Sequence, residues 1–230
     1  MAGRATGCLK WAAIGFAIII VVAVMAYKIA FPTYSYRYRL HLAVEIEGKA
    51  YAGSSVIEVD WSCGLKIADS GCGATLDGQA TVIDLGARGV LVALLHPGEF
   101  NTPVSQQGTD ARFLCANAFD KRSTHQELPS LPYLAGRRNL SPRNFPYLIW
   151  FPTPADKQSA RKVTPEDISS KIDPTARFTE AFVEITVDPI VIDIASKLPW
   201  YPALQREQKG KAIMTQSGML QLVYNMFVED

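Results

Sequence analysis

Serine, carboxylate and cysteine side chains are the groups of this chain that could do chemistry. Ser54 and Ser55 follow Gly53, which is the nearest approach to a nucleophile motif. The glycine that a nucleophile elbow needs after its serine is missing, and the pair falls within a predicted strand instead of a strand-to-helix turn. The Ser-Met-x-Pro context of membrane-anchored Ser–Lys peptidases is also absent. We therefore interpret both serines as small residues on a sheet face.

Two pairs of carboxylates have a spacing that general acid–base catalysis could use. They are Asp167 with Asp173, and Glu180 with Glu184. Glu180, Glu184 and Thr186 share the polar face of a predicted strand, so we expect them to be solvated. The sequence therefore predicts no catalytic residue.

The cysteines divide into one close pair and two single residues. Eight residues separate Cys63 from Cys72, whereas Cys8 and Cys115 stand alone. In an oxidising compartment the pair would close a small loop worth about 2–3 kcal/mol. The alternative is three reduced, partly buried thiols in the domain.

Metal and cofactor sites are not expected. Structural zinc needs paired short spacings of Cys or His, and His41, His96 and His125 are scattered. We interpret each histidine as an ordinary surface residue or as one whose hydrogen bonds are satisfied. The turn at residues 86–89 lacks the context of a phosphate-binding loop.

A basic cluster and an aromatic corner are the candidate interaction surfaces. Arg137 and Arg138 are the centre of the densest group of cations, which could meet lipid headgroups; the other members are Arg143, Lys121 and Arg122. Trp200 and Tyr201 lie in a stiff turn between two prolines and could dock a membrane complex. The alternatives are that the cations are ordinary loop charges and that the two aromatic residues belong to the core.

Net charge argues against nucleic-acid binding. The chain of 230 residues has 23 Lys plus Arg and 22 Asp plus Glu, so its formal charge is +1. A nucleic-acid-binding protein would show a strongly basic face.

An uncharged run, residues 11–27, precedes everything that could fold as a soluble domain. At about 1.5 Å per residue it spans roughly 25 Å, the short end of a hydrocarbon core. Trp11 and Tyr27 stand at its ends, where aromatic residues favour the interface, and Lys28 can extend toward the headgroups. We predict a transmembrane anchor at residues 11–31 that holds the chain in the lipid bilayer.

Two alternatives to an uncleaved anchor remain, a cleaved signal peptide and a buried core helix. Residues 24–26 make only a poor cleavage site, and the run has no polar stripe. The numbers of positive charges before and after the uncharged run are nearly equal, so they do not by themselves set its orientation. A short tail, residues 1–10, usually stays inside, so we expect the domain to be exported.

Hydrophobic periodicity predicts the elements of the domain. Residues 34–46 alternate between apolar and polar side chains, and residues 50–61 pair back as a hairpin. A second hairpin is predicted at residues 79–85 and 90–95. Further strands are predicted at 147–151 and 177–187, and helices at 109–122 (capped by Thr109), 164–172 and 190–198 (capped by Asp188). Residues 128–146 read as a Pro-rich loop with at most one helical turn, and 219–228 as a strand or a helix.

Four segments together resemble a family of conserved hypothetical proteins. They read SYRYRLHLAVEIEGKAYAGSSVIEVDW, VIDLGARGVLVALL, PYLIWF and TEAFVEITVDPIVIDIASKLPWY. The chain resembles membrane-anchored proteins of Proteobacteria that share this order of motifs. The family has no assigned activity, so the resemblance implies no catalytic residues, and it implies a bacterial source.

These observations predict a single-pass protein with one α+β domain at residues 34–230. A mainly antiparallel sheet of about six strands is expected, with short helices packed on one side. Its parts are the hairpins (34–96), a helix and loop (97–146), and C-terminal strands and helices (147–230).

The predicted role is a periplasmic interaction or scaffold domain on the bacterial inner membrane, with an unknown envelope protein as partner, no cofactor and no nucleic acid. A membrane-tethered hydrolase with an unrecognised site is the alternative, and a cytoplasmic peripheral module is the third reading. A Cys63–Cys72 bridge would exclude the third.

Overall fold

The computed structural model describes the backbone of most of the chain. The described ranges are residues 5–63, 72–97, 108–122, 124, 126–207, 213–214, 221–222 and 226–229. Within them, the side chains of residues 5–13, 30, 207, 213–214 and 221–222 are not described. The predicted element at residues 219–228 therefore lies largely outside the described residues.

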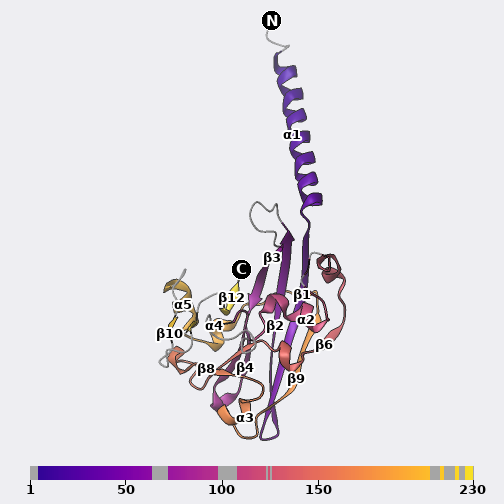
Figure 1. The fold of residues 1–230 in the computed structure, drawn as a ribbon. Coiled ribbons are helices and arrows are strands. Elements are labelled where there is room, and N and C mark those ends of the chain that lie inside the picture. The colour runs from indigo at the N-terminus through magenta and orange to yellow at the C-terminus, as the bar shows by residue number, and fades with distance from the viewer. Residues whose placement is uncertain are drawn as a thin grey trace.

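Helix α1 (Ala5–Ala30) is 26 residues long and stands apart from the body of the chain (Figure 1). Its described apolar side chains, from Ile14 to Ile29, are mostly exposed. Pro32 follows closely, and because proline has no N–H to donate it cannot continue the helix. Across the described part of the chain, no helix is long and apolar enough to cross a membrane.

The first hairpin is confirmed. Strand β1 (Thr33–Ile46) pairs antiparallel with β2 (Lys49–Cys63) along its whole length. Glu47 and Gly48 form the two-residue turn, and both have positive φ, 51° and 77°. This is the turn geometry that matches the twist of a hairpin.

The hairpin forms the centre of a six-stranded antiparallel sheet, sheet A. Its strand order is β12-β3-β2-β1-β9-β6. The other members are β3 (Cys72–Gln79), β6 (Arg137–Asn139), β9 (Arg177–Ile185) and β12 (Val228–Glu229). Strands β3 and β6 were not predicted, because their residues do not alternate cleanly between apolar and polar.

A second antiparallel sheet, sheet B, has the order β4-β5-β7-β8. Its strands are β4 (Thr81–Asp84), β5 (Val90–Leu94), β7 (Tyr147–Phe151) and β8 (Arg161–Val163). The 3-10 turn η1 (Gly86–Arg88) joins β4 to β5. Two further short strands, β10 (Ile213–Met214) and β11 (Gln221–Leu222), pair only with each other.

Sheet B lies between two hydrophobic cores, so the prediction of one sheet with helices on one side needs correction. One face of sheet B packs on sheet A, with Leu42, Leu91 and Trp150 among the buried residues. Its other face packs on α4 (Ile194–Lys197) and α5 (Tyr201–Glu207). Every residue of β5 and β7 is consequently buried. The two predicted hairpins exist but belong to different sheets.

The predicted helices are shorter than their sequence patterns suggested. Helix α2 (Ala111–Ala118) is capped by Asp110 and not by Thr109, because the Asp110 side chain accepts the Arg112 backbone N–H. Helix α3 (Ile168–Lys171) begins later than predicted: Asp167 stands at its N-cap without a side-chain cap bond, and its carboxylate accepts the backbone N–H of Thr164. The Pro-rich stretch contains η3 (Leu128–Tyr133) and η4 (Pro142–Asn144) besides β6, and η5 (Lys157–Ser159) precedes β8.

Candidate functional site

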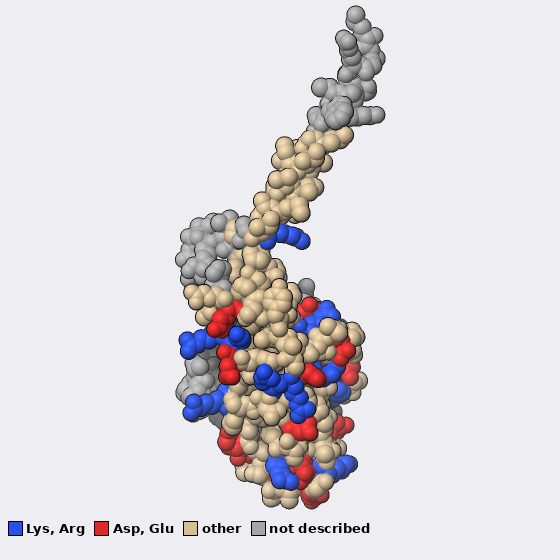
Figure 2. Space-filling model, turned by 90° about the vertical axis from the view of Figure 1, so that its right-hand side faces the viewer, with Lys and Arg blue, Asp and Glu red and all other residues tan. Residues whose placement is uncertain are grey.

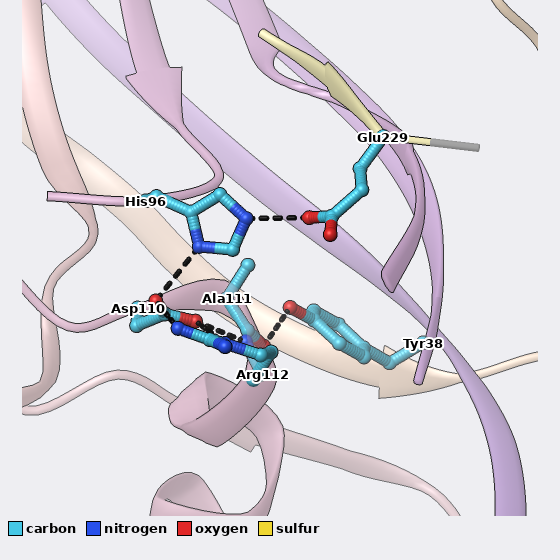
Figure 3. A network of polar contacts seen from close by, with 6 residues as sticks. All are labelled: Tyr38, His96, Asp110, Ala111, Arg112 and Glu229. Atoms are coloured by element: carbon cyan, nitrogen blue, oxygen red, sulfur yellow. Dashed lines mark hydrogen bonds and ion pairs between the residues drawn. The ribbon is translucent and has the colours of Figure 1, made fainter. Parts of the chain in front are cut away.

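A cluster of charged side chains forms where sheets A and B meet α2. His96 follows β5, and its ring lies between two carboxylates (Figure 3). Nδ1 is 2.8 Å from Oδ2 of Asp110, and Nε2 is 2.5 Å from Oε2 of Glu229 in β12. The ring therefore joins the N-terminus of α2 to the C-terminal strand.

Two further contacts fix Asp110 and the start of α2. The Arg112 guanidinium donates to both Asp110 oxygens, at 2.9 and 2.7 Å. The Tyr38 hydroxyl, which is buried in β1, donates to the Ala111 carbonyl at 2.7 Å. The cluster thus connects β1, the end of β5, α2 and β12.

The electrostatics favour a charged His96. Burial of the ring disfavours its charged form, but the hydrogen bonds with Asp110 and Glu229 and their negative charges outweigh it and raise the pKa of His96 to about 9. Burial also opposes ionisation of Asp110, but hydrogen bonds from His96 and Arg112 lower the pKa of this carboxyl to about 2. Two cations thus face two anions, which lowers the cost of burying them.

This geometry holds a proton in place and does not activate a nucleophile. A general base needs one free ring nitrogen within reach of the group that it deprotonates. Both ring nitrogens of His96 face carboxylates, so neither is free to act as a base on a hydroxyl or thiol. Sequence reasoning missed the cluster because His96 lies 14 residues from Asp110 and 133 from Glu229.

The serine candidates are on opposite faces of β2. Ser55 is buried, and its hydroxyl lies 2.5 Å from that of Thr81. Ser54 is exposed and stands opposite His41 in the β1–β2 register. Nε2 of His41 faces Glu180 at 3.5 Å, and within the described chain no hydrogen bond joins Ser54 to His41. The arrangement therefore lacks a nucleophile–base pair.

The carboxylate candidates are separated, and each has its own cation. Asp167 pairs with Lys171 at 2.7 Å, whereas Asp173 pairs with Arg88 at 2.9 Å. Glu180 and Glu184 lie four residues apart on β9, which is about 13 Å along a strand. The Glu180–Glu184 separation is longer than the spacing of paired catalytic carboxylates in glycosidases, and the two aspartates bind different cations.

The arginine candidates do not form a single basic surface. Arg137 and Arg138 are neighbours in β6, so their side chains leave opposite faces of the sheet. Arg137 lies 3.6 Å from the ring centroid of Phe182, and Arg138 lies 4.8 Å from that of Phe119. Lys and Arg alternate with Asp and Glu over the body in Figure 2.

Tyr201 lies in the second core, and Trp200, which is partly buried, packs against that core. The Trp200 ring packs 5.5 Å from both Phe151 and Phe227, and its indole N–H donates to the Pro154 carbonyl at 2.9 Å. Tyr201 is buried. Strand β7 is likewise entirely buried.

Cys63 and Cys72 form a disulfide, and they are register partners across β2 and β3. This bridge is consistent with an oxidising, extracytoplasmic location. Cys115 is free and buried in the first core, and burial raises the pKa of its thiol to about 12. Cys115 is therefore an inert thiol at neutral pH.

The predicted helix at residues 190–198 is wrong in its first half. Only Ile194–Lys197 is helical, and residues 186–193, which we call the crossing segment, are neither helix nor strand. Asp188, the predicted cap, forms an ion pair with Arg39 instead. Pro189 and three β-branched residues in succession also disfavour a helix here.

Polar contacts fix both ends of the crossing segment to sheet A. At one end, Thr186 N–H donates to the Arg37 carbonyl at 3.1 Å. At the other, Gln79 Oε1 accepts the N–H groups of Asp193 and Ile194 at 2.8 and 2.9 Å. The segment therefore passes from β1 across β2 to the end of β3.

The crossing segment is longer than its path, and it exposes apolar side chains. Two strand spacings are about 10 Å, whereas the five residue steps from Asp188 to Asp193 can span about 16 Å. The exposed apolar side chains of the segment are Val187 (93%), Val191 (61%) and Ile192 (48%). Three of the five large apolar side chains that are exposed on the described surface outside α1 therefore lie in this one segment; the other two are Phe113 and Tyr133.

The predicted anchor residues lie in α1. Tyr27 is exposed, and its ring lies 5.0 Å from that of Phe31. Lys28 is in the last turn of the helix. The side chain of Trp11 lies outside those that the structure describes.

Comparison with known proteins returns no match, whether with family models, curated proteins or solved structures. The resemblance to a proteobacterial family therefore stays a prediction from the quoted motifs.

Proposed function

We propose that this chain is a membrane-tethered, extracytoplasmic interaction domain that docks a partner protein through the crossing segment. The exposure of Val187, Val191 and Ile192 carries this proposal. Apolar side chains gathered on a surface favour contact with another protein. Because Arg39 and Gln79 hold the two ends of the segment, a partner would lose little conformational entropy on binding it.

The tether is proposed from the sequence together with the exposure of α1. Residues 11–27 carry no charge, and α1 presents apolar side chains such as Phe16 and Met25 to its surroundings. In water this exposure is unfavourable at about 25 cal/mol per Å². A lipid bilayer removes that cost, so we propose that α1 inserts in the inner membrane of a bacterium.

The disulfide supports placing the body in the periplasm. Bridges between cysteines persist in oxidising compartments and are rare where thiols are kept reduced. The Cys63–Cys72 bridge therefore favours the exported orientation over the cytoplasmic one.

Photo-crosslinking in intact membranes tests the docking surface. A photoreactive amino acid at Val191 is expected to give one discrete adduct, and the same probe at Tyr133, which is 86% exposed on η3, is not. Val187→Asp should abolish the adduct without changing expression, since this side chain has no packing to lose. Equal labelling at both positions, or an adduct that survives Val187→Asp, would overturn the proposal.

Topology is tested separately with a reporter fused after Asp230. A reporter that is active only outside the cytoplasm should give signal, and extraction at high pH should leave the chain in the membrane. Signal from a reporter that works only in the cytoplasm would contradict the periplasmic placement.

A further inference from the structure

The described C-terminal residues, 226–229, bridge the two sheets. Val228 and Glu229 pair with Gln79 and Gly78 at the edge of sheet A. The Phe227 carbonyl accepts the Ala80 N–H at 2.7 Å. The Met226 carbonyl accepts the Leu95 N–H, just past β5 of sheet B, at 2.8 Å. A four-residue segment therefore closes the space between β3 and β5.

Three buried side chains, Met226, Phe227 and Val228, and one ion pair add to its attachment. Phe227 is fully buried, and its ring packs 5.5 Å from Trp200 and 6.0 Å from Tyr201. Glu229 accepts from His96, whose side chain is only 13% exposed. Backbone hydrogen bonds and apolar contacts do not change between pH 6 and pH 10, so among the contacts described above the ion pair is the one that titrates.

We propose that residues 226–229 are a latch that the charged His96 ring keeps closed, and that loss of the ring proton opens it. The groups that face His96 come from each element packed around it. They are Asp110 at the cap of α2, Arg112 in α2 and Glu229 in β12, with the neutral Tyr38 hydroxyl of β1 on the Ala111 carbonyl. A neutral ring keeps one N–H, so it can still donate to one carboxylate, but the attraction between its positive charge and Glu229 is lost. Asp110 keeps the hydrogen bonds from Arg112, whereas Glu229 keeps only the more distant charge of Arg112.

The expected effect is moderate, because opening removes only one of the two carboxylates from His96. Asp110 still faces the ring in the open state, so only part of the raised pKa is coupled to the latch. One pKa unit of coupling corresponds to a factor of about ten in the opening equilibrium. Opening would expose the edge of β3 and the slot that Phe227 fills, and would leave sheet B intact.

A fluorine probe on Phe227 of the full-length chain in detergent tests the latch. With 4-fluorophenylalanine at this position, the open signal should increase about tenfold between pH 7 and pH 10. The midpoint should follow the titration of His96 itself. The same probe at Phe151, whose ring also packs on Trp200, should keep its signal.

Variants separate a latch from general unfolding. Glu229→Gln should raise the open population at pH 7 and remove its pH dependence, and it should lower the pH at which His96 titrates. Glu166→Gln makes the same chemical change at an exposed position and should do neither. Three results would overturn the proposal: a wild-type probe that ignores pH, a Phe151 probe that changes together with the Phe227 probe, or unaltered His96 titration in Glu229→Gln.

Discussion

Gly53 of β2 and Val82 of β4 approach so closely that a Cβ on Gly53 would stand 2.2 Å from the Val82 carbonyl oxygen. The contact lies on the inner face of sheet A, where sheet B packs against it. Only a residue without a side chain allows the two backbones to come so near.

Gly53→Ala should destabilise the fold by about 2–3 kcal/mol, because the clash is with backbone and cannot be relieved by a rotamer change. Gly73→Ala is the matched control, since nothing lies within 4 Å of a Cβ at that position of β3. Denaturant unfolding of both variants measures the difference. A Gly53→Ala variant as stable as Gly73→Ala would contradict the close packing of the two sheets.

Reduction of the Cys63–Cys72 bridge should lower the free energy of unfolding by about 2–3 kcal/mol, since it frees a short loop in the unfolded chain. The double variant Cys63→Ala/Cys72→Ala should show the same lower stability with and without reductant. Thermal unfolding with and without reductant is the measurement. If reductant destabilises the double variant too, the bridge is not the source of the effect.

Phe227→Ala should cost about 3–4 kcal/mol, because a fully buried aromatic ring leaves a cavity between Trp200 and Tyr201. Phe113→Ala removes the same atoms from a ring that is 37% exposed against Trp61, and should cost about half as much or less. Denaturant unfolding followed by Trp fluorescence measures the free energy of unfolding of both variants. An equal loss of stability in the two variants would mean that the C-terminal segment does not contribute to the second core.

Alkaline pH should weaken the fold through His96. Its pKa is about 9 in the folded chain against about 6.5 unfolded, so the stabilisation is complete below pH 6.5 and is lost as the pH rises through 9. The free energy of unfolding should fall by about 2–3 kcal/mol between pH 6 and pH 10. His96→Gln, measured at the same two values of pH, should lack this component, and an equal decline in both proteins would refute the assignment.

Acid should act through Asp110 in the opposite direction. Its pKa is lowered from 3.8 to about 2, so its contribution is present above pH 3.8 and is lost as the pH falls through 2. Asp110→Asn retains a good helix cap but removes the charge, and should flatten this part of the stability curve. The acid and alkaline effects report the same ion pair from its two sides, so their free energies are not additive.

Local patterns predicted the hairpins well, because the alternation in β1 and β2 reflects one buried and one solvated face. β3 was missed because Gly73, Thr75, Asp77 and Gly78 leave little apolar pattern to recognise. The sequence also could not show that β3 and β4 belong to different sheets. The two strands are nearly continuous in sequence, and only the packing of the folded chain separates them.

Long-range contacts explain the remaining errors. A Pro preceded by Asp resembles a helix start, yet Arg39 binds Asp188 and Gln79 holds Asp193, so tertiary contacts override the local signal in the crossing segment. The His96 cluster has no local signature at all, because its two carboxylates come from other elements. The aromatic corner at Trp200 was recognisable, but its burial depended on where the C-terminal segment lies.

The link between α1 and β1 consists of only two residues, 31–32, and one of them is a proline, whose ring fixes φ. So short a link leaves few free torsions, and it keeps the start of β1 close to the end of α1. With 14 residues in β1, the Glu47–Gly48 turn stands about 46 Å beyond this link. Under the membrane tether that we propose, this link keeps the start of β1 at the bilayer surface, so a partner of the crossing segment would have to bind within about 46 Å of the membrane.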